Sequence, residues 1–399
     1  MKIITDKEKI EDILNRGTED IFIEEHLKQE LLSGRQLRVK FGIDPTGPAI
    51  HLGRAVPLRK LRALQDLGHK IVLIVGDFTA RIGDPSDKLE KRPMLTEAEI
   101  KKNLKTYLTQ IGKIIDVSKA EVHYNSTWLS KMTYLDTAKL LECFTVQQMS
   151  KRRNFHERLE KGQDIFVVEF MYPALQGYDS VKIKADLEIG GFDQLFNLKA
   201  GRIVQKKYGQ KEQDVMTVVM LEGTDGRKMS SSWGNVISLL DTAEMMYGKI
   251  MALRDDLIIK YFTLCTDIAM SEINSFKKEL EKGVNPRDLK MKLAFEIVKL
   301  YHGEKKAKKS EEDFISTFQK KEVPEKMEEA KGNNGDLLRD ILVKNKVVSS
   351  NSEWRRLVSE KAVHDLDNND NISDQNIKIN KNIRLRIGKK RFLKIMVIK

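Results

Sequence analysis

Two apolar runs on either side of a helical stretch constrain the fold of this chain more than any other feature. Residues 37–43 alternate apolar and polar side chains, as a short strand does, and residues 70–75 form a continuous apolar run typical of a parallel sheet buried on both faces. Between them, residues 59–67 are apolar at helical spacing. Two strands joined by a helix form a right-handed βαβ unit. The sequence therefore predicts an α/β fold in which ligands bind at the carboxyl ends of parallel strands.

The loop after the first of these strands, residues 44–51, is suited to a polyanion. Pro45 and Pro48 stiffen it, and Thr46 and His51 can donate hydrogen bonds to phosphate oxygens. The helix that begins near His51 directs its unpaired N–H groups and its positive end the same way. A phosphate site is one interpretation. An ordinary strand-to-helix connection is the other, because Gly, Pro and His are common in loops.

A second group of polar residues lies on a predicted helix at residues 171–180. Tyr172, Gln176 and Asp179 are four and three residues apart, so a hydroxyl, an amide and a carboxylate share one helix face. They form either a ligand-binding face or a set of satisfied core groups. Other polar side chains follow predicted strands, namely Asp77, Thr79, Asp84, Asp193 and Gln194.

The loop at residues 222–235 carries Lys228 followed by three serines within five residues. A mobile loop with a lysine suits a pyrophosphate whose charge changes during a reaction. A surface hairpin is the alternative interpretation.

The chain is basic, with a formal net charge of +12 and a pI of about 9.3. This excess favours a polyanionic partner, nucleic acid first. Residues 336–399 contain 15 Lys and Arg against 8 Asp and Glu, so seven of the twelve excess charges lie there. A helix with Arg355 and Arg356 and a hairpin turning at Gly388 are predicted in this segment, where basic side chains could track a phosphate backbone. A solvated basic tail is the alternative.

The two cysteines, Cys143 and Cys265, both lie in apolar segments. Buried thiols in a reducing compartment are expected, with no disulfide framework and no cysteine metal site. The N-terminus lacks a signal-peptide core, and no run approaches membrane-spanning length. We expect a cytoplasmic protein without a membrane partner.

The remaining segments are predicted from periodicity and charge. Residues 1–34 are expected to form an amphipathic helix, and residues 151–163 a charged linker. Residues 241–319 are expected to be mostly helical, and residues 322–335 to form a second charged linker.

Three motifs, in their order along the chain, resemble those of a known family. Residues 42–46 (Gly-Ile-Asp-Pro-Thr), 51–54 (His-Leu-Gly-Arg) and 228–232 (Lys-Met-Ser-Ser-Ser) resemble the paired signatures of the class I aminoacyl-tRNA synthetases. Intermediate stretches extend the likeness over nearly the whole chain to the bacterial-type tyrosyl-tRNA synthetases, at residues 83–86, 172–179 and 190–194.

The resemblance implies a domain organisation. A Rossmann-like catalytic domain is expected at 1–238, with a connective insertion at about 115–200. A helical anticodon-binding domain would follow at 239–322, then a linker at 323–335. A small α+β module at 336–399, like the RNA-binding fold of ribosomal protein S-four, would complete a chain that works as a homodimer.

The resemblance also implies a reaction in two steps. L-Tyrosine and ATP, with Mg²⁺ bound to the ATP and no dedicated protein metal site, give tyrosyl-adenylate and pyrophosphate. The tyrosyl group then moves to the 3′-terminal adenosine of tRNA(Tyr).

Matching positions imply roles in four groups. The phosphates and the departing pyrophosphate would be held by Thr46, His51, Lys88, Arg92, Lys228 and Ser230. The remaining ATP contacts would come from Asp44, Gly53, Gly191, Asp193 and Gln194, with Lys228. The tyrosine would be bound by Asp84, Tyr172, Gln176 and Asp179, the last accepting from the phenol. The tRNA would be contacted by Arg355, Arg356, Lys389 and Lys390.

Four residues depart from the family pattern. Lys40 stands where many relatives have a second tyrosine that touches the phenol, Arg54 replaces the second histidine of the first signature, and Ser231 replaces a lysine of the last. Lys361 occupies a position that is usually glycine. A tryptophanyl-tRNA synthetase and a non-catalytic RNA-binding paralogue remain alternatives. The face with Gln176 and Asp179 favours a phenol, because a carboxylate accepts from a hydroxyl.

Overall fold

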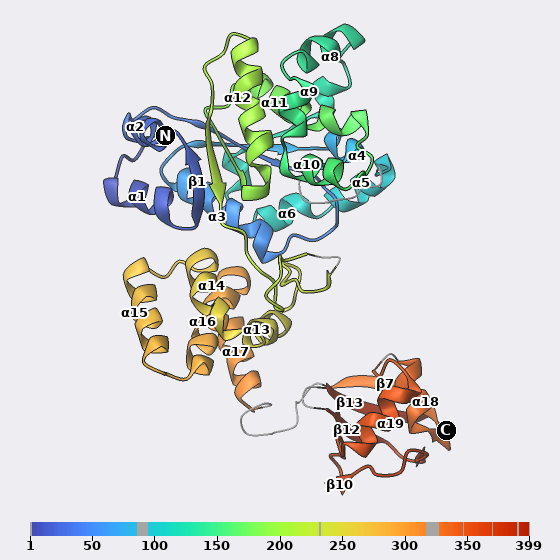
Figure 1. The fold of residues 1–399 in the computed structure, drawn as a ribbon. Helices are drawn as coiled ribbons and strands as arrows, with labels where there is room; N and C mark the ends of the chain where they lie inside the picture. Colours follow the sequence, from blue (N-terminus) through green and yellow to red (C-terminus); the bar gives the residue numbers. More distant parts are fainter. Residues whose placement is uncertain are drawn as a thin grey trace. The chain divides into compact units, whose positions relative to one another are not determined.

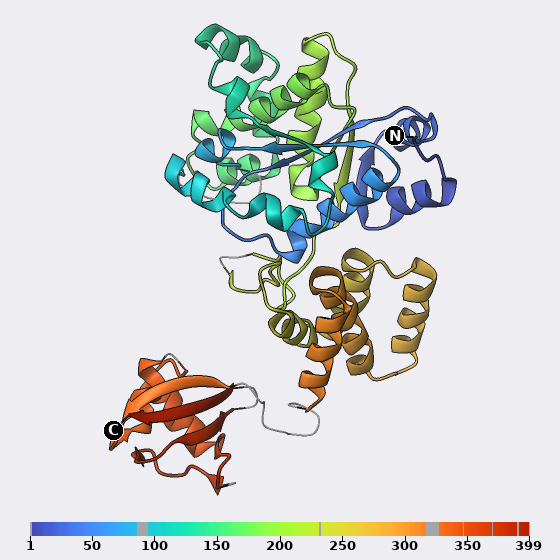
Figure 2. The same cartoon turned by 180° about the vertical axis from the view of Figure 1, so that it is seen from behind.

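The computed structural model describes residues 2–85, 95–230, 233–316, 327–345, 347–368, 370–388 and 391–398. The chain forms two compact units, residues 1–307 and 308–399. Figure 1 shows the ribbon coloured along the sequence, and Figure 2 shows it from behind.

A six-stranded sheet organises the first unit, with the strand order β1-β6-β5-β2-β3-β4. Five neighbouring strands run parallel, and only β1 is antiparallel, to β6. The strands are β1 (Thr18–Phe22), β2 (Arg38–Ile43), β3 (Lys70–Val75), β4 (Glu121–Tyr124), β5 (Leu187–Gly191) and β6 (Asp214–Val218). The pairing of β2 with β3 confirms the predicted βαβ unit.

Helices cover both faces of this sheet (Figures 1 and 2). The crossover helix α3 (Leu52–Asp66) lies on one face, and α11 (Val167–Ile183) and α12 (Leu195–Lys207) pack together on the other. Gly177 on α11 lets these two helices approach, because a Cβ there would lie 3.1 Å from the Ala200 carbonyl oxygen. The other helices of this region are α1 (Lys7–Asn15), α2 (Glu24–Leu32), α4 (Thr79–Ile82), α5 (Glu97–Leu104), α6 (Tyr107–Ile111), α7 (Ser126–Leu129), α8 (Tyr134–Leu141), α9 (Val146–Ser150) and α10 (Arg153–Glu160).

The segment after the sheet region is mostly helical, as predicted, and up to residue 307 it belongs to the same compact unit. It contains α13 (Ala243–Met251), α14 (Ile258–Cys265), α15 (Met270–Glu281), α16 (Pro286–His302) and the start of α17 (Glu304–Phe314). Arginines anchor it to the sheet region: Arg16 Nε donates to the Thr263 carbonyl at 2.8 Å, and Arg59 Nη2 donates to the Thr266 carbonyl at 2.6 Å.

Two predictions about secondary structure are wrong. Residues 1–34 do not form one helix, since β1 interrupts them and pairs with β6, with Gly17 at φ +67° before it. Residues 151–163 are not a linker but contain α10, in which Arg158 is buried against Glu169 at 2.6 Å. A charged residue that is buried against a partner on the next helix has the same sequence appearance as an exposed one.

The second unit builds its own core of apolar side chains around Trp354 and Leu385. Its five-stranded sheet has the order β10-β9-β12-β13-β7, and its helices are α18 (Leu338–Lys344) and α19 (Asn351–Ser359). The strands of this unit are β7 (Glu328–Asn333), β8 (Asp336–Leu337), β9 (Val363–Asp365), β10 (Asp370–Asn371), β11 (Lys378–Ile379), β12 (Ile383–Ile387) and β13 (Arg391–Ile398). The antiparallel pairing of β12 with β13, with Gly388 at φ +67°, confirms the predicted hairpin.

One boundary of this unit needs correction. Strand β7 lies within residues 323–335, which we expected to be a linker, and it pairs in parallel with β13 along six residues. Its Ala330 is buried in the core. Lys361 keeps the backbone conformation suited to the glycine expected there, with φ +53°.

Within the described residues, no helix is both long enough and apolar enough to cross a membrane.

Candidate active site

His51 forms the N-cap of α3, and this fixes its protonation. Its Nδ1 accepts a hydrogen bond from the Arg54 backbone N–H at 3.4 Å, which leaves the ring proton on Nε2. Burial, with Arg54 and Lys228 nearby, lowers the pKa of His51 to about 3. A neutral imidazole with an Nε2–H donor therefore stands at the positive end of a 15-residue helix.

Arg54 connects this helix end to the loop after β2. Its guanidinium donates to Thr46 Oγ1 at 2.9 Å and to the Tyr107 hydroxyl at 2.7 Å. Since Arg54 and Lys228 both act on His51, two cations lie around this helix end. The first backbone N–H groups of α3, which we expected to be unpaired, donate within the protein, Leu52 to the Ile237 carbonyl and Gly53 to Met229 Sδ. The positive end of the helix, a hydroxyl, an imidazole and two cations together still favour a polyanion.

Asp44 directly follows β2 and accepts hydrogen bonds from two elements. Thr79 Oγ1 donates to its Oδ1 at 2.8 Å, and the Tyr172 hydroxyl donates to its Oδ2 at 2.9 Å. This arrangement requires glycine at position 76, because a Cβ there would lie 1.9 Å from Asp44 Oδ1. Burial raises the pKa of Tyr172 well above its ordinary value, so it remains a hydroxyl.

Asp179 lies on the same face of α11, fully buried at the side of the site. Trp128 Nε1 donates to its Oδ1 at 2.8 Å, and Asn125 Nδ2 donates to its Oδ2 at 3.2 Å. Burial raises the pKa of Asp179 to about 6, and Lys40 and these two donors oppose the increase. Each oxygen keeps capacity to accept one more hydrogen bond.

Asp84 is held by the segment that follows β5. Gln194 Nε2 donates to one carboxylate oxygen at 2.6 Å, and Asn197 Nδ2 donates to the other at 3.4 Å. Arg152 lies 3.6 Å away as an ion-pair partner. Asp84 also acts electrostatically on Tyr172, so this carboxylate lies close to the α11 face.

Lys228 forms an ion pair with Asp193 at 3.1 Å, which places the loop of residues 222–235 over the end of β5. Asn235 holds the loop: its Nδ2 donates to the Lys228 carbonyl at 3.1 Å, and its Oδ1 accepts from the Ser230 N–H at 2.8 Å. The Gly53 N–H donates to Met229 Sδ at 3.3 Å, so this loop also contacts the start of α3.

The structure thus brings most of the expected residues to the carboxyl ends of the parallel strands. Those described there are Asp44, Thr46, His51, Gly53, Asp84, Tyr172, Gln176, Asp179, Gly191, Asp193, Gln194, Lys228 and Ser230. Arg355 and Arg356 lie exposed on α19 of the second unit. Lys88, Arg92, Lys389 and Lys390 lie outside the described residues.

Several contributors to this site were not predicted from the sequence. Trp128 and Asn125 hold Asp179, Tyr107 holds Arg54, and Asn235 holds the Lys228 loop. The contacts of Trp128, Asn125 and Tyr107 join residues at least 51 positions apart, which only the fold brings together. The Asn235 contacts lie within one loop, and its sequence does not indicate which backbone groups the side chain binds.

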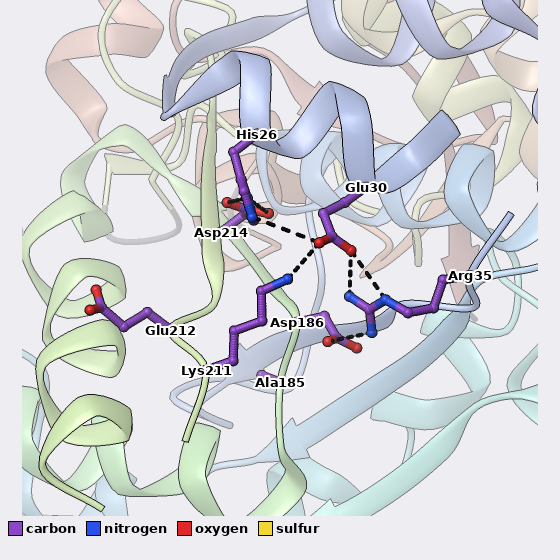
Figure 3. A pocket seen from close by; sticks show the side chains of 8 residues that line it. All are labelled: His26, Glu30, Arg35, Ala185, Asp186, Lys211, Glu212 and Asp214. Atoms are coloured by element: carbon purple, nitrogen blue, oxygen red, sulfur yellow. Dashed lines mark hydrogen bonds and ion pairs between the residues drawn. The ribbon is translucent and has the colours of Figure 1, made fainter. Parts of the chain in front are cut away.

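A small pocket lies at the opposite edge of the sheet, near the amino ends of β5 and β6 (Figure 3). It holds about 190 Å³, part of it open to solvent. Glu30 forms ion pairs there with Arg35 and Lys211, and His26 contacts Asp214 at 2.8 Å. These charges compensate one another, and ligands of open parallel sheets bind at the other edge.

Comparisons with known proteins show the family to which the chain belongs. Residues 32–319 match the family model described as tRNA synthetases class I (W and Y). The chain is 47% identical over 396 residues to the tyrosine–tRNA ligase of Thermotoga maritima, covering 98% of each chain. It is 46% identical over 400 residues to that of Carboxydothermus hydrogenoformans, covering 96% of this chain and 97% of the other.

Solved structures share the fold over about three quarters of this chain. A C-terminally truncated mitochondrial tyrosyl-tRNA synthetase of Aspergillus nidulans has a TM-score of 0.66 at 21% identity, covering 78% of this chain and 95% of that one. The Archaeoglobus fulgidus tyrosyl-tRNA synthetase complexed with L-tyrosine has a TM-score of 0.61 at 23% identity, covering 76% and 99%. The family model and the matches at 46% and 47% identity place the chain in one family. It belongs to the class I tRNA synthetases, among the bacterial-type tyrosyl enzymes.

Proposed function

We propose that this chain is a tyrosine–tRNA ligase that activates L-tyrosine with MgATP and transfers the tyrosyl group to the 3′-terminal adenosine of tRNA(Tyr). The observation that carries the proposal is the buried Asp179 carboxylate, fixed by Trp128 and Asn125. Asn125 also donates to Thr79 Oγ1, which in turn donates to Asp44 in the loop before α3. A carboxylate held by donors on both oxygens suits the phenolic O–H of tyrosine. Phenylalanine would leave this buried acceptor without its partner.

The substrate ammonium group is assigned to the other residues of the α11 face. Tyr172 donates its only proton to Asp44, so its oxygen lone pairs can accept from an ammonium. The Asp84 carboxylate and the Gln176 amide oxygen complete this set. The arrangement fixes both ends of tyrosine and directs its carboxylate toward the helix end at His51.

In the first step, a carboxylate oxygen of tyrosine attacks the α-phosphorus of MgATP, and the bond to the β,γ-pyrophosphate breaks. No proton needs to move, so the protein acts mainly by positioning and by stabilising charge on the leaving pyrophosphate. We assign this to Thr46, His51, Lys228 and Ser230, with Lys88 and Arg92. Asp44, Gly53, Gly191, Asp193 and Gln194 would line the remainder of the ATP site.

In the second step, the 3′-terminal adenosine hydroxyl attacks the tyrosyl carbonyl carbon, and AMP leaves. We assign tRNA contacts to the helical region and to the second unit, with its exposed Arg355 and Arg356. Lys389 and Lys390, which lie outside the described residues, are assigned the same role. The surplus of seven positive charges in residues 336–399 supports this assignment.

We also propose a homodimer formed through α8, α9 and the start of α11, where α8 packs against α11. Large apolar side chains are exposed there: Tyr134 by 99%, Val167 by 80%, Val146 by 66% and Leu135 by 64%. Monomeric proteins rarely expose such a group. Sedimentation velocity should give a dimer for the unmodified chain and a monomer for Val167→Asp, and a monomeric unmodified chain would refute this.

The proposed location is the cytoplasm. It is supported by free cysteines at both positions, Cys143 and the buried Cys265.

Aminoacylation of transcribed tRNA(Tyr) tests the proposed function. We expect an ester of labelled tyrosine at the tRNA 3′ end, with little product from phenylalanine or tryptophan. Preferential formation of an ester with tryptophan would identify the chain as a tryptophanyl-tRNA synthetase. RNA binding without an ester from any amino acid would indicate a non-catalytic paralogue, as the departures at Arg54 and Ser231 allow.

A further inference from the structure

Lys40 and Glu188 form an ion pair inside the sheet region. They are Cα partners on the neighbouring parallel strands β2 and β5, their side chains are both 0% exposed, and Nζ lies 2.9 Å from Oε1. A buried ion pair contributes little net stability, because desolvation of both charges offsets their attraction. The presence of this buried pair is therefore not explained by stability.

Every donor of the Lys40 ammonium is used within this network. Besides Glu188, Nζ donates to the Gln176 backbone carbonyl at 2.7 Å and to Ser180 Oγ at 2.8 Å. An ammonium has three N–H groups. Lys40 therefore has none left for a substrate phenol, and it does not replace the second tyrosine of other family members in that role.

Glu188 is equally occupied. Its Oε1 accepts from Gln176 Nε2 at 3.1 Å, and its Oε2 accepts from Gln213 Nε2 at 2.5 Å and Ser180 Oγ at 3.2 Å. Gly201 makes room for this arrangement, since a Cβ there would lie 2.4 Å from Gln213 Nε2.

The two charges together hold Gln176 at two points. Lys40 binds its backbone carbonyl, and Glu188 binds its side-chain amide nitrogen. A carboxylate can only accept, so the Gln176 NH₂ group must face Glu188 and its Oε1 must face the other way. Within the described part of the chain, no group donates to that Oε1.

We infer that Lys40 and Glu188 are positioning residues which fix the Gln176 amide oxygen toward the ammonium group of the amino-acid substrate. This inference rests on the proposed function, in which Gln176 is one of the ammonium acceptors. The pair acts on specificity for an α-amino group, while Asp179 acts on the phenol.

The test separates these two ends of the ligand. L-Tyrosine has an ammonium group, and 3-(4-hydroxyphenyl)propionate has the same phenol and carboxylate without it. The decisive variant is Lys40→Met/Glu188→Met, which removes both charges at similar volume and is expected to fold, because replacing a buried pair by apolar residues is often neutral.

In tyrosine-dependent exchange of pyrophosphate into ATP, we expect the KM for tyrosine of this variant to rise about tenfold, the effect of losing one oriented hydrogen bond to a charged group. The inhibition constant of 3-(4-hydroxyphenyl)propionate should change less than about twofold. Lys40→Met/Glu188→Gln restores one acceptor oxygen opposite Gln176 and should give an intermediate KM.

Lys60→Met is the matched control for removal of a buried lysine. The Lys60 ammonium donates to the Ile13 and Arg16 carbonyls and has no contact with Gln176, so its loss should lower the Tm without changing the KM for tyrosine. The inference would be overturned by an unchanged KM for tyrosine in the double variant, or by an equal loss of affinity for tyrosine and for 3-(4-hydroxyphenyl)propionate. In either case, tyrosine-dependent exchange by the unmodified chain would still support the proposed function. Absence of that exchange in the unmodified chain would overturn both.

Discussion

The Tyr172 hydroxyl donates a hydrogen bond to Asp44 Oδ2 at 2.9 Å, and this bond joins the helix α11 to the loop that precedes α3. Thr79 holds the other oxygen of the same carboxylate at 2.8 Å. The groups assigned to the amino acid and to ATP are therefore built on one shared carboxylate. A substitution that breaks either of these hydrogen bonds to Asp44 should weaken the binding of both tyrosine and ATP.

Gly76→Ala tests the packing around Asp44. The added Cβ would lie 1.9 Å from Asp44 Oδ1 and 2.4 Å from Thr79 Oγ1, so the hydrogen bond between them cannot persist. We expect a loss of roughly 2–4 kcal/mol in the free energy of unfolding, measured with urea. Gly42→Ala is the control, because nothing lies within 4 Å of its Cβ position, and it should change stability by less than about 0.5 kcal/mol. Equal effects of the two variants would contradict this packing.

Asp179→Asn tests how the phenol is recognised. The amide keeps the size of the carboxylate but loses the charge that strengthens the hydrogen bond from the phenol. The kcat/KM for tyrosine should fall roughly 10- to 100-fold, equivalent to about 1.5–3 kcal/mol. Discrimination against phenylalanine should narrow by a similar factor. The control Asp186→Asn, at the amino end of β5, should change neither kcat/KM for tyrosine nor the discrimination against phenylalanine. If Asp179→Asn leaves the ratio of kcat/KM for tyrosine to that for phenylalanine unaltered, Asp179 does not recognise the phenol.

The pH dependence of kcat/KM for tyrosine should follow the ionisation of the Asp179 carboxyl group. Burial raises the pKa of Asp179 to about 6 from the ordinary value of 3.8. The protonated form is therefore favoured by folding, and the stability that it contributes below pH 3.8 is lost as the pH rises toward 6. Tyrosine recognition needs the ionised form, so the kcat/KM for tyrosine should fall as pH drops below about 6. Trp128→Phe removes a donor to the ionised form and should move this decline to higher pH. If kcat/KM for tyrosine falls at the same pH in Trp128→Phe as in the unmodified chain, Asp179 is not the group whose protonation causes the fall.

His51 combines a structural and a chemical role that two substitutions can separate. His51→Ala should lose the N-cap of α3, at about 1 kcal/mol, and the Nε2–H donor, at about 100-fold in kcat for adenylate formation. His51→Asn retains a capping oxygen and should recover the Tm while kcat stays low. Because the pKa of His51 lies at about 3, its titration should not appear in kcat between pH 5 and 8. Full activity of His51→Ala would exclude it from the phosphate site.

The second unit can be tested by removing its exposed arginines. Arg355→Ala/Arg356→Ala should weaken tRNA binding and lower the slope of log affinity against log salt by about one for each lost phosphate contact. Adenylate formation should not change, because these residues lie on α19 with their own core. Lys344→Ala, on α18 of the same unit, serves as a charge-removal control, and an unaltered salt slope in the double variant would refute the assigned contacts.

Much of the catalytic fold follows from local pattern. The continuous apolar run at β3 has every residue after its first buried, and this signal sufficed to predict a parallel βαβ unit. The spacing of Tyr172, Gln176 and Asp179 likewise predicted their common helix face. Both inferences depend only on the periods of strand and helix.

What could not be predicted depends on contacts between distant segments. Strand β1 looks helical because its apolar residues continue the pattern of α1, and only its pairing with β6 makes it a strand. Lys40 and Glu188 are 148 positions apart, and nothing near either residue indicates that the sheet register places them opposite one another. The same holds for Trp128, whose indole reaches Asp179 across 51 positions.

The most direct test of the central claim is amino-acid-dependent exchange of labelled pyrophosphate into ATP, measured with each of the twenty amino acids in the presence of Mg²⁺. The account predicts exchange with L-tyrosine and none above background with L-phenylalanine or L-tryptophan. Exchange with another amino acid in place of tyrosine, or with none of them, would contradict it.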